Sequence, residues 1–369
     1  MEEGEDSCLP LDMAWIKRQY SKGQIDRAGA LLVALNSEML VPADEVDPAF
    51  VVINNWRSAH SYPLQAIKMN LLRRAKKIDS EALIAQRLKR LPSITLKLIH
   101  NPNMKLSQMQ DIGGCRAVMA TMKDVKKLVR VYERSRIKNP RHGRPIQHAH
   151  DDYISNPKPD GYRSYHLIFK YQSKYQDKKA FEGQRIEIQL RSRLQHAWAT
   201  AVETVQTFTG QALKAKIKAG SDPEWLRFFA LMGSAIALRE GCALVPGTPQ
   251  NEKELVQEIR HLASKLAVHD TLSAWGFAAQ RVMSNPGDAK TFLLVLDSNK
   301  KTLVTTPFRA DELKKAFEMY LKVEKDSAEH PEIQAVLVSV DSIAALEEAY
   351  PNYFLDTNAF LDAMSEAIG

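Results

Sequence analysis

The chain contains little cysteine and no long apolar run. Its three cysteines, Cys8, Cys115 and Cys242, are far apart and form no CxxC pair, so neither a disulfide framework nor a zinc site is expected. No apolar stretch approaches the roughly 20 residues that span a bilayer. The first twelve residues are acidic and lack the basic and then apolar pattern of a secretory signal. These absences predict a cytoplasmic protein that does not associate with a membrane.

The charge balance is uneven along the chain. The formal net charge is +7, but residues 1–220 carry 37 Lys and Arg against 22 Asp and Glu, whereas residues 221–369 carry 14 against 22. A basic first part suits polyanionic ligands such as nucleotides or RNA. A solvated charged surface explains the same excess equally well, and the acidic second part could fold back on the basic part and screen it.

At 369 residues the chain is long enough for two or three domains, and it shows no internal repeat. We predict an N-terminal helical segment (1–45), a central domain (46–218), a helical region (222–285) and a small C-terminal α+β module (288–369). Helices are expected over 11–40, 51–78, 82–91, 94–99, 124–136, 194–207, 224–240 and 252–283, and strands over 111–120, 164–172 and 185–191. The C-terminal module reads as strands 291–296, 302–307 and 333–340 with helices 310–325, 342–349 and 357–368.

The most informative stretch is a turn-rich loop that opens into a strand, followed by a second strand. The loop Asn156–Gly161 contains two prolines and a glycine, which fix an unusual backbone. Alternation along the second strand places Glu187, Gln189 and Arg191 on one side of a sheet and Ile186, Ile188 and Leu190 on the other. An aromatic loop beside an acidic, amide and basic strand face suits a purine nucleotide and its phosphates.

Two basic and acidic clusters precede this loop. Residues 87–97 supply Arg87, Lys89 and Lys97, and several cations of this kind converge on a triphosphate; an exposed basic helix has the same composition. Asp111 opens a predicted strand, a common position for a Mg²⁺ ligand, and Arg116 follows after paired glycines. The alternative is a turn aspartate with a paired surface arginine.

The loop and the second strand offer acceptor-binding groups. Tyr162 follows a glycine and could stack on a purine, with Lys158, Arg163 and His166 nearby; a loop with a core tyrosine is the alternative. Glu187 could bind a metal or take a proton from a hydroxyl nucleophile. His148, His150 and Asp151 have the spacing of metal ligands, but a flexible loop with unrelated histidines is the favoured interpretation.

In this order the clusters resemble the synthetase domain of the RelA/SpoT family, the enzymes that make the alarmone (p)ppGpp. The family patterns are RxKxxxSIxxK, DxxGxR, YxxxPKxxGYRSxH and E(I/V)Q(I/L)R. The corresponding residues here are Arg87, Lys89, Ser93, Ile94 and Lys97; Asp111, Gly114 and Arg116; Tyr153, Pro157, Lys158, Gly161, Tyr162, Arg163, Ser164 and His166; and Glu187, Gln189 and Arg191. The resemblance covers roughly residues 50–210.

The resemblance implies a fold and an activity. The expected fold class is α+β, a nucleotidyltransferase-like mixed sheet flanked by helices, and the expected reaction moves the β,γ-pyrophosphate of ATP to the ribose 3′-hydroxyl of GDP or GTP. Residues implied to hold the ATP phosphates are Arg87, Lys89, Lys97 and Arg116. Asp111 and Glu187 are implied to bind Mg²⁺, and Glu187 to activate the acceptor hydroxyl. The implied acceptor-binding residues are Tyr162, Lys158, Arg163, His166, Gln189 and Arg191.

The acceptor remains open. Asp151 and Asp152 stand just before Tyr153, where many small alarmone synthetases carry a lysine, and two carboxylates would repel 5′ phosphates. A toxic relative that pyrophosphorylates the 3′ end of tRNA, restrained by its C-terminal module, is the alternative, and adenine nucleotides are further candidate acceptors. A non-enzymatic nucleotide-binding module would not need both Asp111 and Glu187. Homo-oligomerisation and intramolecular regulation by the C-terminal module are both open.

Overall fold

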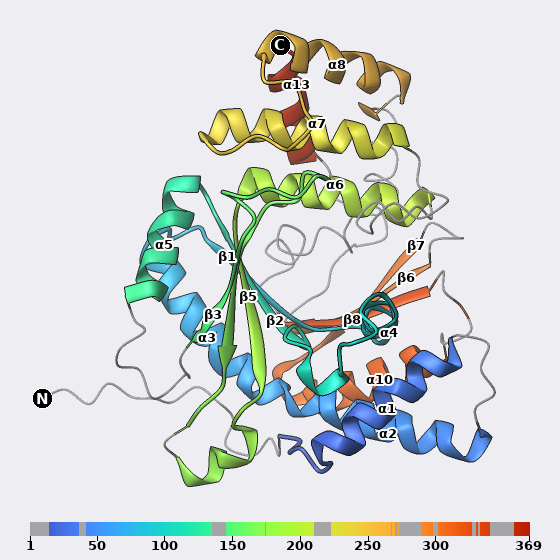
Figure 1. The fold of residues 1–369 in the computed structure, drawn as a ribbon. Coiled ribbons are helices and arrows are strands. Elements are labelled where there is room, and N and C mark those ends of the chain that lie inside the picture. Colours follow the sequence, from blue (N-terminus) through green and yellow to red (C-terminus); the bar gives the residue numbers. More distant parts are fainter. Residues whose placement is uncertain are drawn as a thin grey trace, which may run out of the picture.

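The computed structural model defines a helix-and-strand arrangement that matches the predicted α+β class (Figure 1). The structure describes residues 15–36, 42–134, 145–173, 175–209, 223–266, 268–269, 272, 290–297, 302–326, 330, 333–339 and 358–369.

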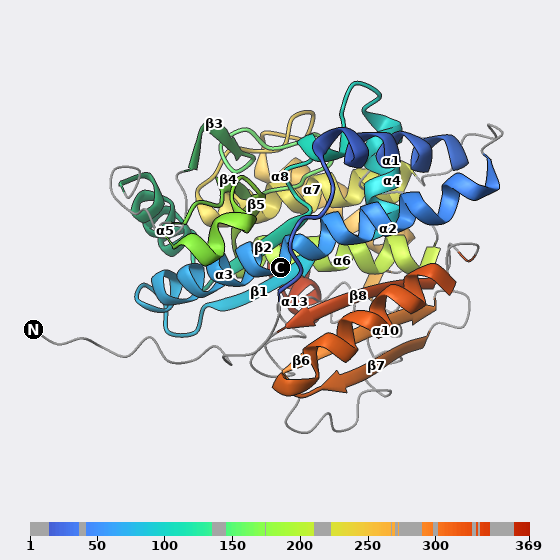
Figure 2. The same cartoon turned by 90° about the horizontal axis from the view of Figure 1, so that it is seen from below.

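Within these residues, eight strands form one mixed sheet (Figure 2). They are β1 (Leu83–Leu88), β2 (Gly113–Met119), β3 (Pro145–Asp152), β4 (Tyr165–Lys170), β5 (Arg185–Ser192), β6 (Thr291–Asp297), β7 (Thr302–Phe308) and β8 (Ile333–Ser339). Their order across the sheet is β3-β4-β5-β2-β1-β8-β6-β7. The pair β2–β5 is parallel, and the other neighbouring pairs are antiparallel. The predicted mixed sheet flanked by helices is therefore confirmed.

One face of the sheet is apolar and is covered by two helices. Helices α3 (Ser61–Lys76) and α5 (Met122–Arg134) pack against it. Because side chains alternate along a strand, the inward residues of β5 are the apolar ones, and Ile186, Ile188 and Leu190 are fully buried. This confirms the predicted alternation and leaves Glu187, Gln189 and Arg191 for the opposite face.

Residues 82–91 contain a strand, and the predicted helix there is wrong. β1 pairs antiparallel with β2 over its whole length, from Leu83 opposite Val118 to Leu88 opposite Gly113. Ala, Leu, Gln and Arg favour helices, but pairing in the centre of the sheet overrides that preference. Pro92 lies in the first turn of α4 (Leu91–His100), where its fixed φ suits the beginning of a helix.

The interpretation of residues near His148 as a loop is also wrong. They lie in β3, in which His150 and Asp151 face Leu167 and His166 of β4. The strand lies at the edge of the sheet, and it is polar, as edge strands often are. It therefore lacks the apolar alternation from which strands are predicted.

Two groups of helices flank the sheet. Helices α1 (Lys22–Leu35) and α2 (Ala43–Ala59) share an apolar cluster with α4, through Ile25, Ile53 and Ile94 among others. Helices α6 (Arg193–Thr209), α7 (Pro223–Glu240) and α8 (Glu252–Lys265) are stacked at the other end of the molecule, and α13 (Asn358–Ile368) crosses them (Figure 1). The C-terminal helix α13 therefore packs against the predicted helical region.

The C-terminal strands extend the central sheet. β8 lies beside β1, with Arg87 opposite Val338, and β6 and β7 follow outward. A 3₁₀ turn (Ala310–Glu312) leads into α10 (Leu313–Asp326), which packs on β6 and β8 (Figure 2). These strands and this helix lie where the sequence predicts them.

Some predictions are left open by the described residues. The expected helix over 342–349 and most of residues 270–283 lie outside them. The domain boundaries remain a prediction. No helix in the described part of the chain is both long enough and apolar enough to span a membrane.

Candidate active site

Five of the twelve predicted site residues lie in two rows on the polar face of the sheet. Residues directly opposite on neighbouring strands point to the same face. The first row is Arg87 of β1, Gly114 of β2 and Glu187 of β5, and the second is Arg116 of β2, Gln189 of β5 and His166 of β4. The glycine between Arg87 and Glu187 has no side chain, so the first row keeps a gap between a cation and a carboxylate.

Asp111 lies just before β2, between two lysines. Its Oδ2 accepts a hydrogen bond from Nζ of Lys89 at 2.8 Å and its Oδ1 accepts one from Nζ of Lys97 at 2.9 Å. Burial alone would raise the pKa of Asp111, but attraction to the two ammonium groups lowers it below its usual range. Burial lowers the pKa of Lys89, and Asp111 opposes that shift. The structure thus brings the first two sequence clusters into one charged group.

Glu187 is held by a histidine and an amide. Its Oε1 lies 3.1 Å from Nδ1 of His166, and its Oε2 accepts a hydrogen bond from Nε2 of Gln189 at 2.7 Å. Burial would raise the pKa of Glu187, yet the bond and charge of His166 lower it, while the charge of Asp111 opposes that lowering. The negative charges of Asp111 and Glu187 therefore repel each other.

His166 links Glu187 to the loop. Its Nε2 lies 2.9 Å from the hydroxyl of Tyr162. Burial would lower the pKa of His166, but Tyr162 and Glu187 raise it to about 9. At neutral pH the ring is therefore an imidazolium that keeps Glu187 ionised.

The loop before β4 is fixed by its own side chains. Asp152 Oδ1 accepts hydrogen bonds from the amides of Ile154 and Ser155, and Asp160 Oδ1 accepts one from the amide of Tyr162. These are Asx-type turns of the kind that aspartate supplies in loops. Asp152 therefore has a structural role in this loop, although the sequence pattern presents it as a misplaced charge.

Gly161 lets the loop approach the helical layer. Its φ of 92° lies in the left-handed region, and a Cβ there would stand 2.9 Å from the carbonyl oxygen of Phe229 and 3.0 Å from the ring of Trp198. Gly233 of α7 makes the same approach from the other side, since its Cβ would lie 3.0 Å from Cα of Gly161. The motif glycine thus seats Tyr162 against α6 and α7.

Lys158 and Tyr153 complete the aromatic side of the site. Nζ of Lys158 lies 4.3 Å from the ring centre of Tyr153 and 5.2 Å from that of Tyr162, which is cation–π distance. Burial and Asp151 raise the pKa of Tyr153 to about 12, so its hydroxyl stays protonated. Tyr153 was not among the predicted site residues, although it opens the third sequence pattern, and that position was the available signal.

Two predicted acceptor-binding arginines contact the protein itself. Arg163 is buried and donates hydrogen bonds to the carbonyl oxygens of Ala243 at 2.6 Å and Ile154 at 3.4 Å. Arg191 is also buried and contacts Nδ1 of His196. Burial and the charges of the neighbouring arginines hold the pKa of His196 well below its usual value. Arg163 therefore anchors the loop before β4 to the segment that follows α7. A contact of either arginine with an acceptor remains a prediction.

The Mg²⁺ site at Asp111 and Glu187 remains a prediction, and the donor set can be compared with what the ion prefers. In the described part of the chain, no group of three or more His, Cys, Asp and Glu side chains is arranged to hold a metal ion. Mg²⁺ commonly takes one or two carboxylates and completes its shell with phosphate oxygens and water. Asp111 and Glu187, which repel each other across the polar face, fit that donor set.

Comparisons with known proteins agree with the sequence patterns. Residues 86–208 match the family model described as a region found in RelA / SpoT proteins. An uncharacterized protein of Mycobacterium tuberculosis strain H37Rv is 27% identical over 233 residues, which cover 63% of this chain and 70% of that protein.

Among solved structures, small alarmone synthetase 2 from Bacillus subtilis has 24% identity and a TM-score of 0.34 over 41% of this chain and 78% of its own. Small alarmone synthetase 1 from the same organism, bound to its product pppGpp, has 20% identity and a TM-score of 0.39 over 50% of this chain and 93% of its own.

Residues 86–208 are a RelA/SpoT-family synthetase region, as the sequence patterns predict. That assignment indicates an enzyme of the pyrophosphokinase type. It rests on the matched region together with the four patterns within it.

Gly161→Ala should destabilise the folded protein. The change adds left-handed strain and a clash with Phe229, together about 2–4 kcal/mol of unfolding free energy. Gly247→Ala is the matched control, because its φ is 79° and nothing lies within 4 Å of its Cβ position; it should cost about 1 kcal/mol. Equal losses in chemical denaturation would show that the close approach at Gly161 is unimportant.

His166 should titrate near pH 9. Because its folded pKa lies above the ordinary value of 6.5, its contribution to stability is fully present below about pH 6.5 and is lost as the pH rises through about 9. NMR titration of the ring protons measures this directly. Glu187→Gln should move the midpoint downward, and a midpoint near 6.5 in the unaltered protein would contradict the assigned contacts.

Proposed function

We propose that the chain transfers the β,γ-pyrophosphate of ATP to the ribose 3′-hydroxyl of GDP or GTP and makes (p)ppGpp. The observation that carries the proposal is that two differently held carboxylates, one before β2 and one on β5, influence each other electrostatically. Asp111 lies between two lysines, and Glu187 lies between a histidine and an amide. The first environment suits a polyphosphate donor, and the second suits a hydroxyl acceptor.

The donor end is rich in cations. Lys89 and Lys97 meet at Asp111, and Arg87 and Arg116 lie on β1 and β2 on the same face. Transfer of a phosphoryl-type group needs in-line positioning and charge neutralisation more than covalent catalysis. Incoming phosphates would share the two ammonium groups with Asp111, and the arginines would add bidentate contacts.

Mg²⁺ is part of the proposal. Asp111 and Glu187 would hold the ion, since their mutual repulsion across the face is what a divalent cation relieves. When bound, the ion supplies charge neutralisation for the phosphate oxygens.

The acceptor end is organised around Glu187. The acceptor 3′-oxygen would form a bond to the β-phosphorus while the bond from that phosphorus to the α,β-bridging oxygen breaks, and AMP leaves. The hydroxyl proton passes to Glu187, whose carboxylate is kept ionised by His166. A carboxylate of lowered pKa is a weak base, which suffices because such transition states are loose and develop little need for proton removal.

Tyr162 would stack on the acceptor base while its hydroxyl remains joined to His166. Gln189 orients Glu187, and Lys158 stands over the two tyrosine rings, where it can meet acceptor phosphates.

A second candidate acceptor is the 3′ end of tRNA. The excess of Lys and Arg over residues 1–220 favours a polyanion larger than a nucleotide. At the acceptor end, Asp151 contributes to the raised pKa of Tyr153, so a carboxylate stands close to the aromatic side of the site, where it would repel nucleotide 5′ phosphates. A guanine nucleotide is retained as the first candidate because the donor and acceptor groups of the family patterns are all present.

Glu187→Gln should abolish transfer. The amide keeps the shape of the side chain but removes the carboxylate proposed both to hold Mg²⁺ and to take the hydroxyl proton, so kcat should fall by at least about 100-fold. Glu81→Gln, at an exposed carboxylate beside β1, is the control and should retain full activity. Loss of less than tenfold in Glu187→Gln would remove this residue from the proposed role.

The acceptor can be identified with ATP labelled at the γ position. The purified protein is incubated with Mg²⁺, labelled ATP and, in turn, GDP, GTP, ADP or bulk tRNA, with Glu187→Gln in parallel. Label in a guanine nucleotide is the expected result. Label found solely in tRNA would replace the proposal by the second candidate, and label in no acceptor would overturn both.

A further inference from the structure

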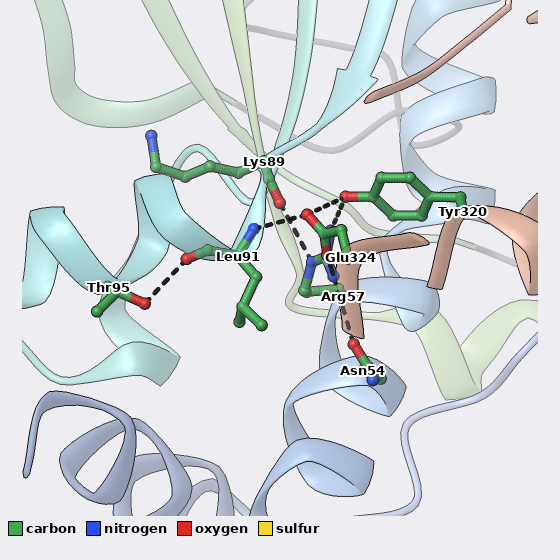
Figure 3. Close-up of polar contacts among 7 residues, drawn as sticks. All are labelled: Asn54, Arg57, Lys89, Leu91, Thr95, Tyr320 and Glu324. Atoms are coloured by element: carbon green, nitrogen blue, oxygen red, sulfur yellow. Dashed lines mark hydrogen bonds and ion pairs between the residues drawn. The ribbon is translucent and has the colours of Figure 1, made fainter. Parts of the chain in front are cut away.

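A buried ion pair between distant parts of the chain lies behind the donor-binding residues (Figure 3). Nη1 of Arg57, in α2, donates to Oε2 of Glu324, in α10, at 2.6 Å, and the side chains are 0% and 6% exposed. Tyr320 joins them: its hydroxyl donates to Oε1 of Glu324 at 2.8 Å and accepts from Nη2 of Arg57. None of the three is a residue that the family patterns include.

The pair holds the backbone on both sides of Arg90. Nε of Arg57 donates to the carbonyl oxygen of Lys89 at 3.1 Å, and the amide of Leu91 donates to Oε1 of Glu324 at 3.0 Å. Figure 3 shows these contacts meeting between the end of β1 and the first turn of α4. The two elements are joined by just Lys89 and Arg90, so their connection is fixed at both ends.

Glu324 acts as a long-range cap for α4. The first amides of a helix have no partner within the helix, and a carboxylate there accepts a hydrogen bond and is also stabilised by the helix dipole. Arg90, at the capping position, makes no side-chain cap bond. The required acceptor comes instead from a residue 233 positions further along the chain.

The capped helix carries donor-binding chemistry. Lys89 precedes α4 and Lys97 lies within it, and the two ammonium groups meet at Asp111. The direction of α4 decides where Lys97 lies relative to Lys89. Whatever fixes the start of α4 therefore sets the spacing of the two cations.

We propose that Glu324 and Arg57 are positioning residues for the donor phosphates. The proposal rests on the proposed function and assigns α10 to the support of the ATP site. A buried ion pair adds little net stability compared with apolar packing of the same volume, but its geometry is directional. Here it fixes one short connection, from Lys89 to Leu91, and through it the pair of lysines around Asp111.

The test compares Glu324→Gln with Glu318→Gln, an exposed carboxylate on the same helix. The amide can still accept from Leu91 but leaves the buried charge of Arg57 unmatched. The KM for ATP should rise about tenfold, while kcat and the KM for the acceptor stay within about twofold. Glu318→Gln should match the unaltered protein in all three. A purely structural role would lower the active fraction and would not separate the two KM values.

A binding measurement covers the case in which Glu324→Gln does not fold. Tyr320→Phe removes one hydroxyl that bonds Glu324 and should weaken the binding of a non-hydrolysable ATP analogue, measured by calorimetry on the full chain. Unchanged analogue affinity in folded variants would overturn the positioning role while leaving the proposed function intact. Tighter analogue binding would also overturn it, since Glu324 would then compete with phosphate at the start of α4. If the unaltered protein bound no ATP analogue, the proposed function would fail with it.

Discussion

The polar face of the sheet depends on the ion pairs that the carboxylate of Asp111 forms with Lys89 and Lys97. The group is 13% exposed, and an uncompensated charge in such a place would be costly. Two ammonium groups compensate it, and they in turn need it, because without it Lys89 and Lys97 would repel each other. One lysine follows β1 and the other belongs to α4, so the contacts that compensate Asp111 also hold a helix to the sheet.

The second carboxylate shows how one face can treat two similar groups differently. Glu187 is bonded by His166 and Gln189 and not by a pair of lysines, and these two contacts keep it ionised. Charge density is therefore high at Asp111 and moderate at Glu187. The two ends of the face differ in character because their partners differ in charge and not because the carboxylates do. Gly114, between Arg87 and Glu187, leaves the row open where reacting groups would meet.

Much of this arrangement could be predicted from the sequence, because it is encoded in short, local patterns. The alternation of β5 assigns Glu187 and Gln189 to one face, and the glycine before Tyr162 marks the unusual loop. The helix predicted over 82–91 was wrong because residues with helical preferences are held in a strand by β2 and β8. The interpretation of His150 as a loop residue was wrong because the polar edge strand carries no apolar signal. The bond between Glu324 and Arg57 has no sequence signal at all: neither residue lies in a pattern, and 267 positions separate them.

The place of β8 and α10 in the sheet has a consequence for the order of events during synthesis. A ribosome makes β1, α4, β2 and β5 well before it makes Glu324 or the strand that lies beside β1. Until then the first amide of α4 lacks its carboxylate and β1 has an open edge. The polar face of the sheet is thus completed late, by residues outside its two rows. A translation product that ends before α10 would contain every family pattern and still lack the part that locks the first of them in place.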